Sequence, residues 1–176
     1  MNFGQALDSA LIKNYKTFKG RACRAEWFYF LLFSVGLTIL ISIIGGIVSV
    51  AGLDVEYLAT LSEEQAAEYL LESPQFEYLK WISIVVGLLL FLPSLSVTVR
   101  RLQDLDYSFY WAIPYFLTSA LALIISFDPL AELAQRLGGA VNLVSIVYIL
   151  VFLRKGSYGP NRFGENPLEE NPKDTY

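Results

Sequence analysis

Long uncharged runs separated by short polar segments dominate the hydrophobic pattern of this chain. No residue from Trp27 to Ala51 is charged, and about 20 apolar residues are enough to cross the hydrocarbon core of a bilayer. Comparable runs follow, so the pattern predicts an all-α, multi-pass membrane protein. Its four predicted transmembrane helices cover residues 27–51, 79–99, 107–127 and 137–153.

The fourth predicted helix has the weakest signal. Its uninterrupted apolar run extends only over residues 140–153, which is short for a membrane span. Starting the helix at Leu133 lengthens it, at the cost of placing Arg136 near the membrane interface.

Two further helices are expected outside the spans. Residues 2–19 predict an N-terminal amphipathic helix, with Asn2 and Gln5 spaced as a capping box. This helix either lies in the membrane interface or packs on the protein's own surface. A short outer-face helix is expected over about 62–72, and Ser73-Pro74 begins the next helix. The apolar stripe of the N-terminal helix consists of Phe3, Leu7, Ala10, Leu11, Tyr15 and Phe18.

The stretch from Pro93 to Trp111 is a polar interruption between the second and third predicted spans. It carries two arginines and two aspartates, so it is interpreted as a turn at the membrane surface. Pro93 is expected to kink the second span, because its ring removes a backbone hydrogen bond one turn back. The carbonyl groups left free are expected to bond nearby hydroxyl groups, those of Ser94, Ser96 and Thr98.

Basic residues predict the orientation of the chain. Eleven lysines and arginines lie before the first span, in the central turn or in the tail, whereas only Lys80 and Arg136 lie on the other side. Basic residues favour the cytosolic side of short loops, so both termini and the central turn are expected in the cytosol. Residues 1–167 are expected to form a single membrane domain that ends in a compact loop rich in turn formers, followed by a flexible tail over 168–176.

Composition removes several classes of function. The chain has no histidine and one cysteine, Cys23, which excludes an internal disulfide and any histidine-based metal site or catalytic pair. No phosphate-binding loop, nucleophile elbow or dinucleotide fingerprint occurs. Apart from Lys80, the second residue of the second predicted span, no charged residue falls inside the predicted spans, so ion coupling has no obvious group there. The net charge of −4 comes from the outer acidic segment and does not indicate nucleic-acid binding. We expect no catalytic residue, metal or cofactor.

Polar chemistry gathers instead in three segments that the predicted topology brings to the cytosolic surface. It could bind an anionic headgroup, phosphate or a protein partner, since the planar guanidinium of arginine suits phosphate and carboxylate. It could equally be an internal ion-pair cluster that locks the helix ends, for example Arg101 and Asp104 with Arg162 and Glu26. The cluster comprises Arg21, Arg24, Glu26, Arg100, Arg101, Gln103, Asp104, Asn161 and Arg162.

The same residues carry a family resemblance. The segments Gly20–Phe28, Pro93–Trp111 and Gly156–Pro167 resemble, in this order, three motifs of the bacterial family called domain of unknown function 805, of the YhaH and YhaI type. The resemblance implies a multi-pass protein of the bacterial inner (plasma) membrane, with no known activity. Gln103 stands where the family usually has histidine, which puts in question any role that needs protonation there. Asp106 and Phe109 stand where glycines are common.

These observations favour a non-enzymatic integral membrane protein whose cytosolic cluster binds anionic lipid or a partner. The alternative is a small transporter or channel subunit that works as an oligomer, packed through small residues of the first span. A membrane enzyme with Asp104 as the base is the least favoured hypothesis. The expected partners are membrane lipids, a second copy of the chain or another membrane protein, and no nucleic acid.

Overall fold

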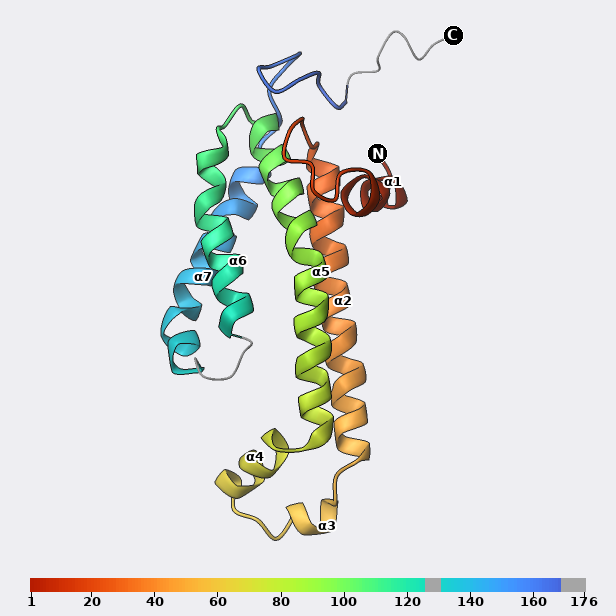
Figure 1. Ribbon diagram of the computed structural model, residues 1–176, viewed down its shortest axis with the longest axis vertical. Coiled ribbons are helices and arrows are strands. Elements are labelled where there is room, and N and C mark those ends of the chain that lie inside the picture. The colour runs from red at the N-terminus through yellow and green to blue at the C-terminus, as the bar shows by residue number, and fades with distance from the viewer. Residues whose placement is uncertain (126–130, 169–176) are drawn as a thin grey trace. The chain divides into compact units, whose positions relative to one another are not determined.

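The computed structural model of the protein describes residues 1–125 and 131–168, and its regular elements in these ranges are helices (Figure 1). The expected all-α class is therefore confirmed. The elements are α1 (Phe3–Asp8), the π-helical turn η1 (Ser9–Lys13), α2 (Arg24–Ala51), α3 (Val55–Leu58), α4 (Glu63–Leu71), α5 (Pro74–Asp104), the 3-10 helix η2 (Phe109–Ala112), α6 (Ile113–Ile125) and α7 (Ala131–Phe152).

The chain forms two compact units. One consists of Met1–Leu32 together with Leu88–Tyr176, and the other of Phe33–Gly87. In the second unit, α2 and α5 pack closely enough that a Cβ atom added at Gly45 would overlap the Leu79 side chain. The first unit contains all the residues of the predicted polar cluster, so the candidate site lies within it.

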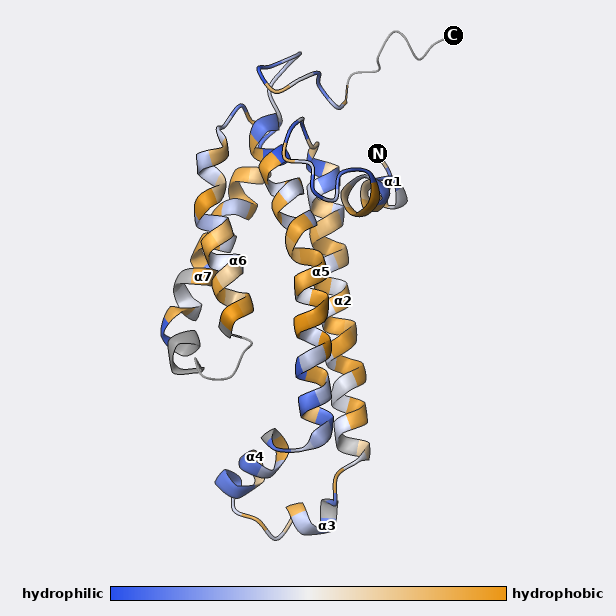
Figure 2. Cartoon of the chain, in the orientation of Figure 1, coloured by the Kyte–Doolittle hydropathy of each residue, from blue (hydrophilic) through white to orange (hydrophobic). Residues whose placement is uncertain are grey.

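Two of the described helices are long and apolar enough to cross a membrane, α2 over Arg24–Ser49 and α5 over Pro74–Asp104. Figure 2 shows hydrophobic residues along most of both helices. Only 6% of the most apolar stretch of α2 is buried, whereas the core helix of a water-soluble protein buries its apolar side chains. The apolar helices Phe109–Ile124 and Arg136–Phe152 are shorter, so two of the four expected spans have the length for a crossing.

Several helix boundaries differ from the expected ones. The second predicted span continues to Asp104 as part of α5, so most of the stretch from Pro93 onward is helix and not turn. The turn is confined to the few residues between α5 and η2. Hydropathy locates the end of an apolar run, but a helix continues when its polar residues find partners. For the same reason α2 begins at Arg24, before the apolar run. The last helix, α7, begins at Ala131.

The third predicted span begins as a 3-10 helix and becomes α6 at Ile113. Pro114 is the second residue of α6, where a missing backbone N–H breaks no helical hydrogen bond. The end of this predicted span falls within residues 126–130, outside the described residues. The sequence predicts a short outer connection that begins at Asp128 and includes Glu132 and Arg136, but both of these residues lie in α7. The predicted flexible tail also lies outside the described residues, except Leu168.

Both predicted capping boxes are present. The side chains of Asn2 and Gln5 cap α1 reciprocally, and those of Ser62 and Gln65 cap α4. The predicted N-terminal helix is shorter than expected, because it ends at Lys13.

The buried side of the N-terminal helix agrees with the predicted stripe except at Phe3, which is exposed. Ala10 is fully buried, as is Ala6, which the stripe did not include, and Leu11 and Phe18 pack against the buried core. Small side chains let this segment pack tightly on the protein, beside the start of α2 in Figure 1. Of the two expected placements, packing on the protein's own surface is therefore the observed one.

The N-terminal segment also supplies the hydrogen bond that Pro93 removes. Proline has no N–H, so the carbonyl of Leu89, one turn earlier in α5, lacks its helical donor. The hydroxyl of Tyr15 donates to this carbonyl at 2.6 Å. The expected hydroxyl groups bond elsewhere: Ser94 to Phe91 O, Ser96 to Asn14 O and Thr17 O, and Thr98 to the Trp27 indole.

Replacing Tyr15 by phenylalanine tests this arrangement. We expect Tyr15→Phe to lower the free energy of unfolding by about 1–2 kcal/mol, because it leaves the Leu89 carbonyl without a donor. In a Pro93→Ala background, the restored backbone N–H of residue 93 can donate to the Leu89 carbonyl. Tyr15→Phe is then expected to lower the free energy of unfolding by less. Denaturant unfolding in detergent micelles, followed by circular dichroism, measures both values. Tyr110→Phe, at an exposed position, is the control; equal losses in the two backgrounds would contradict the assignment.

Candidate functional site

Three helix ends meet in the first unit, together with the N-terminal segment and the C-terminal loop. Backbone bonds join Ala22 N to Arg100 O at 3.1 Å and Ser157 N to Asp104 O at 2.8 Å. They link the start of α2 and the loop after α7 to the end of α5. Figure 2 shows hydrophilic residues where α2 begins and α5 ends. The tertiary structure thus gathers the three segments of the predicted polar cluster.

Asp104 is the centre of the larger ion-pair network. Its Oδ1 accepts a bond from Arg21 Nε at 2.9 Å, and its Oδ2 accepts one from Arg101 Nη1. All three side chains are at least nine-tenths buried. Arg101 also donates to the carbonyl groups of Phe152 and Arg154 at the end of α7. One carboxylate therefore ties the N-terminal segment, α5 and α7 together.

A second, smaller network surrounds Glu26 in the first turn of α2. Its Oε1 accepts hydrogen bonds from Arg100 Nη2 at 2.7 Å and from Ser9 Oγ at 2.8 Å. Glu26 is 2% exposed and Arg100 is 3% exposed. A carboxylate in the first turn is also favoured by the positive end of the helix dipole. This network joins α2, α5 and the N-terminal helix.

The C-terminal loop wraps around Arg21. The guanidinium donates to Ser157 O at 2.7 Å and to Gly159 O at 2.6 Å. Asn161 Nδ2 donates to Gln103 O and to Ser157 Oγ, each at 2.9 Å. A Cβ atom added at Gly156 would overlap the Asp104 carboxylate. The glycine-rich loop is thus shaped to lie against the ion pairs.

Gln103 makes a structural contact at the position where the family resemblance expects histidine. Its Nε2 donates to Phe18 O at 2.9 Å, and its Oε1 is buried without a hydrogen-bond partner among the described residues. The N–H of a neutral histidine could make the same bond to a carbonyl group. The residue therefore tethers the N-terminal segment to α5, a task that needs no change of protonation.

Asp106 stands where the family resemblance expects glycine, and its backbone conformation fits that expectation. Its φ is 61°, in the left-handed region that favours glycine and that aspartate tolerates better than most residues. Its carboxylate pairs with Arg162 Nε at 3.1 Å, and both side chains are more than half exposed. Here aspartate adds a surface ion pair to the turn.

The predicted cluster thus divides into internal and exposed members. The expected Arg101–Asp104 pair is present, but Glu26 pairs with Arg100 and Arg162 pairs with Asp106. Arg24 and Arg162 are exposed. The sequence interpretation missed further participants that have ordinary surface chemistry and no motif, namely Ser9, Phe18, Asp106, Lys155 and Ser157.

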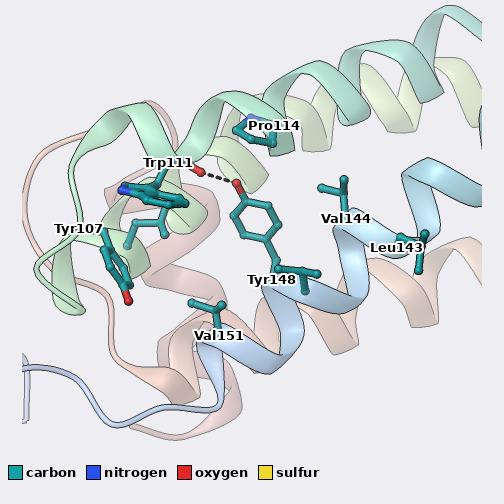
Figure 3. Close-up of a pocket in the computed structure, with 9 residues that line it drawn as sticks. Tyr107, Trp111, Pro114, Leu143, Val144, Tyr148 and Val151 are labelled. Carbon is teal, nitrogen blue, oxygen red and sulfur yellow. Dashed lines mark hydrogen bonds between the residues drawn. The ribbon is translucent and has the colours of Figure 1, made fainter.

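Among the hollows of the described part of this unit, two of similar volume differ in chemistry. The first, of about 410 Å³, is an apolar groove between the start of α6 and the face of α7 that carries Val144, Tyr148 and Val151 (Figure 3). The hydroxyl of Tyr148 is already bonded to Trp111 O. The groove therefore offers packing surface and no free polar group from that tyrosine.

The second hollow, of about 390 Å³, is polar. Arg24, Arg101, Asp104 and Lys155 line it, and Tyr158 at its rim is 98% exposed. The guanidinium groups of Arg24 and Arg101 both line this pocket. Two like charges therefore lie close together at this pocket.

The geometry does not favour catalysis or metal binding at the described residues. Both oxygens of Asp104 accept bonds from arginines, so this carboxylate is not placed to act as a base. Within 1–125 and 131–168, no three acidic or cysteine side chains gather into a group that could hold a metal ion.

Comparison with known proteins identifies the family. Residues 15–165 match the model of a protein of unknown function, DUF805. The chain belongs to the DUF805 family. The match covers the first two motifs, the third motif as far as Glu165, and both ion-pair networks except Ser9.

Curated relatives of this DUF805 chain carry names that state their location. Inner membrane protein YhaI of Escherichia coli (strain K12) is 28% identical over 163 residues, which cover 90% of this chain and 92% of the relative. Inner membrane protein YhaH of the same strain is 26% identical over 161 residues, which cover 91% of this chain and 94% of the relative. No solved structure matches the chain at a significant level.

Neutralising Asp104 tests the importance of the buried network. We expect Asp104→Asn to lower the free energy of unfolding by about 3–5 kcal/mol, because two buried arginines lose their shared counter-charge. The matched control is Asp106→Asn, two residues away, which breaks an exposed pair and costs less than about 1 kcal/mol. Chemical denaturation in detergent micelles compares the two variants. Similar small losses in both would show that the network contributes little.

Proposed function

We propose that this chain is a non-enzymatic protein of the bacterial inner membrane that crosses the bilayer four times. Both termini and the turn between α5 and η2 lie in the cytosol. The basic end of the first unit binds anionic phospholipid of the cytosolic leaflet. The protein takes its membrane location from its helices and its lipid preference from this end.

The membrane location is supported by the relatives and by α2. The matched region covers 92% of one relative and 94% of another, and both are named inner membrane proteins. The large apolar side chains of α2 are exposed, among them Leu32, Ile39 and Ile47. Transferring such surface from water to lipid is favourable by about 25 cal/mol per Å². A bilayer therefore stabilises a helix that the chain itself covers poorly.

The assignment of α6 and α7 as spans rests on composition and exposure. Side chains on both helices are apolar and exposed, including Leu117 on α6 and Leu150 on α7. At about 1.5 Å per residue the apolar stretch Arg136–Phe152 is roughly 25 Å long. A hydrocarbon core is about 30 Å thick, and local thinning of the bilayer accommodates a difference of this size at modest cost.

The observation that carries the lipid proposal is the distribution of exposed basic side chains. They flank the helix ends where the polar networks meet, in segments outside the predicted spans. Each lysine or arginine near an anionic leaflet contributes about 1 kcal/mol of attraction. Tyr110 and Trp111 are exposed near the turn, and such aromatic residues favour the headgroup region. The exposed basic residues of this end are Lys13, Lys16, Lys19, Arg24, Arg154, Lys155 and Arg162, and Arg136, which is also exposed, lies elsewhere on α7.

Cysteine accessibility tests the topology. In a Cys23→Ala background, single cysteines at Glu64, Asp128 and Tyr158 are labelled with a membrane-impermeant maleimide. We expect Glu64→Cys and Asp128→Cys to react in cells whose outer membrane alone is permeable, and Tyr158→Cys only after the inner membrane is opened. If Asp128→Cys also needs the opened membrane, α6 and α7 do not cross and the four-span topology is wrong.

Lipid analysis tests the proposed ligand class. The protein is purified in a neutral detergent, and the retained phospholipids are measured by mass spectrometry against the bulk membrane. We expect anionic phospholipids to be enriched over zwitterionic ones, and the enrichment to decline as ionic strength rises. A retained composition equal to that of the bulk membrane would overturn the proposal.

A further inference from the structure

The buried charges of the site do not balance. Among the described residues at this end, three arginines and two carboxylates are at least nine-tenths buried: Arg21, Arg100, Arg101, Glu26 and Asp104. Their pairing leaves an excess of one positive charge in a region shielded from water. Buried charges are normally compensated, because a lone buried ion costs several kcal/mol.

The backbone compensates only part of this excess. Arg101 donates to Phe152 O at 2.9 Å and also to Arg154 O, so it lies at the C-terminal end of α7. The dipole of a helix is equivalent to roughly −0.5 of a charge at that end. Carbonyl groups of the C-terminal loop solvate Arg21 in a similar way. These dipoles orient the arginines but do not neutralise them.

The polar pocket adds further positive charge next to this excess. Arg24 and Lys155 line it and are exposed. Within the described chain, Arg24 makes one long hydrogen bond, to Leu153 O at 3.4 Å. Lys155 makes no described hydrogen bond or ion pair. The one carboxylate among the lining residues, Asp104, is already shared by two arginines. The pocket is thus net positive, and the one carboxylate among its lining residues is already paired.

The size and rim of the pocket limit the ligand. Its volume of about 390 Å³ falls at the lower end of the range of roughly 300–1,000 Å³ for small-molecule sites. It admits a headgroup and not a whole lipid. Arginine binds phosphate through bidentate hydrogen bonds, and lysine binds it as a point charge. The exposed Tyr158 at the rim suits the interfacial region of a membrane.

We infer that this pocket is a phosphate site, in which Arg24 and Lys155 clamp the phosphate group of a single anionic headgroup above the buried Arg101–Asp104–Arg21 network. The inference rests on the proposed lipid-binding function. It assigns that binding to one site, which holds one headgroup per chain, in place of a whole basic surface. A bound phosphate offsets the excess charge of the network and the repulsion between Arg24 and Arg101.

The test uses the full chain in neutral detergent and soluble probes: inorganic phosphate, a short-chain phosphatidylglycerol and a short-chain phosphatidylcholine. Binding is measured by calorimetry and by the shift of the thermal unfolding midpoint. We expect saturable binding of phosphatidylglycerol at one site and weaker binding of inorganic phosphate, with no comparable binding of phosphatidylcholine. Arg24→Gln and Lys155→Gln should each weaken binding about tenfold, the loss of one charge-assisted hydrogen bond. Both positions are exposed, so the variants are expected to fold.

Lys16→Gln is the matched control, because it removes one exposed positive charge that does not line the pocket. If all three variants weaken phosphatidylglycerol binding equally, or none does, the pocket is not the site, although the proposed lipid binding stands. Another outcome is that the wild type binds inorganic phosphate but not phosphatidylglycerol, and that the pocket variants lose the phosphate binding. In that case the phosphate site stands and the lipid proposal fails. If wild type binds neither probe, both proposals are wrong.

Discussion

The architecture of the first unit depends on one carboxylate held between two buried guanidinium groups. Asp104 is 3% exposed, and its two oxygens accept bonds from Arg21 and Arg101. Removing a charge of this kind from water is costly unless its partners come with it. Arg101 lies three residues earlier in the same helix, but Arg21 is 83 residues away, so the network is complete only when the helix ends have met. Folding and charge pairing are therefore coupled at this point.

The surrounding polar groups follow from that constraint. Arg101 reaches the end of α7, Arg21 holds the C-terminal loop, and Gly156 leaves room for the carboxylate they share. The Glu26–Arg100 pair repeats the arrangement between α2 and α5, with Ser9 bringing in the N-terminal helix. A similar exchange of polar partners occurs where Tyr15 donates to the carbonyl that Pro93 leaves free. Long-range contacts thus replace bonds that the local sequence cannot make.

The pairing of these charges bears on function. Most of the residues that first suggested a binding surface form ion pairs and hydrogen bonds within the protein, so their role is structural. The charges that remain available, Arg24 and Lys155, lie at the edge of this network beside an unbalanced buried charge. A rigid network under two exposed basic side chains is suited to hold an anion in a fixed position. The apolar groove in Figure 3 offers a surface of a different kind, suited to packing against hydrocarbon.

The sequence by itself determined the helical class, the capping boxes of α1 and α4, the start of α5 at Pro74 and the family, because these depend on local patterns and motifs. It also pointed to the polar residues that gather at the helix ends. Tertiary structure decided that α5 extends to Asp104, which carboxylate pairs with which arginine, and which hydroxyl replaces the bond lost at Pro93. Those outcomes depend on contacts between distant segments, for which hydropathy and spacing carry no signal. The left-handed backbone at Asp106 was also decided by the tertiary structure, since the family resemblance indicated a glycine position but no backbone conformation.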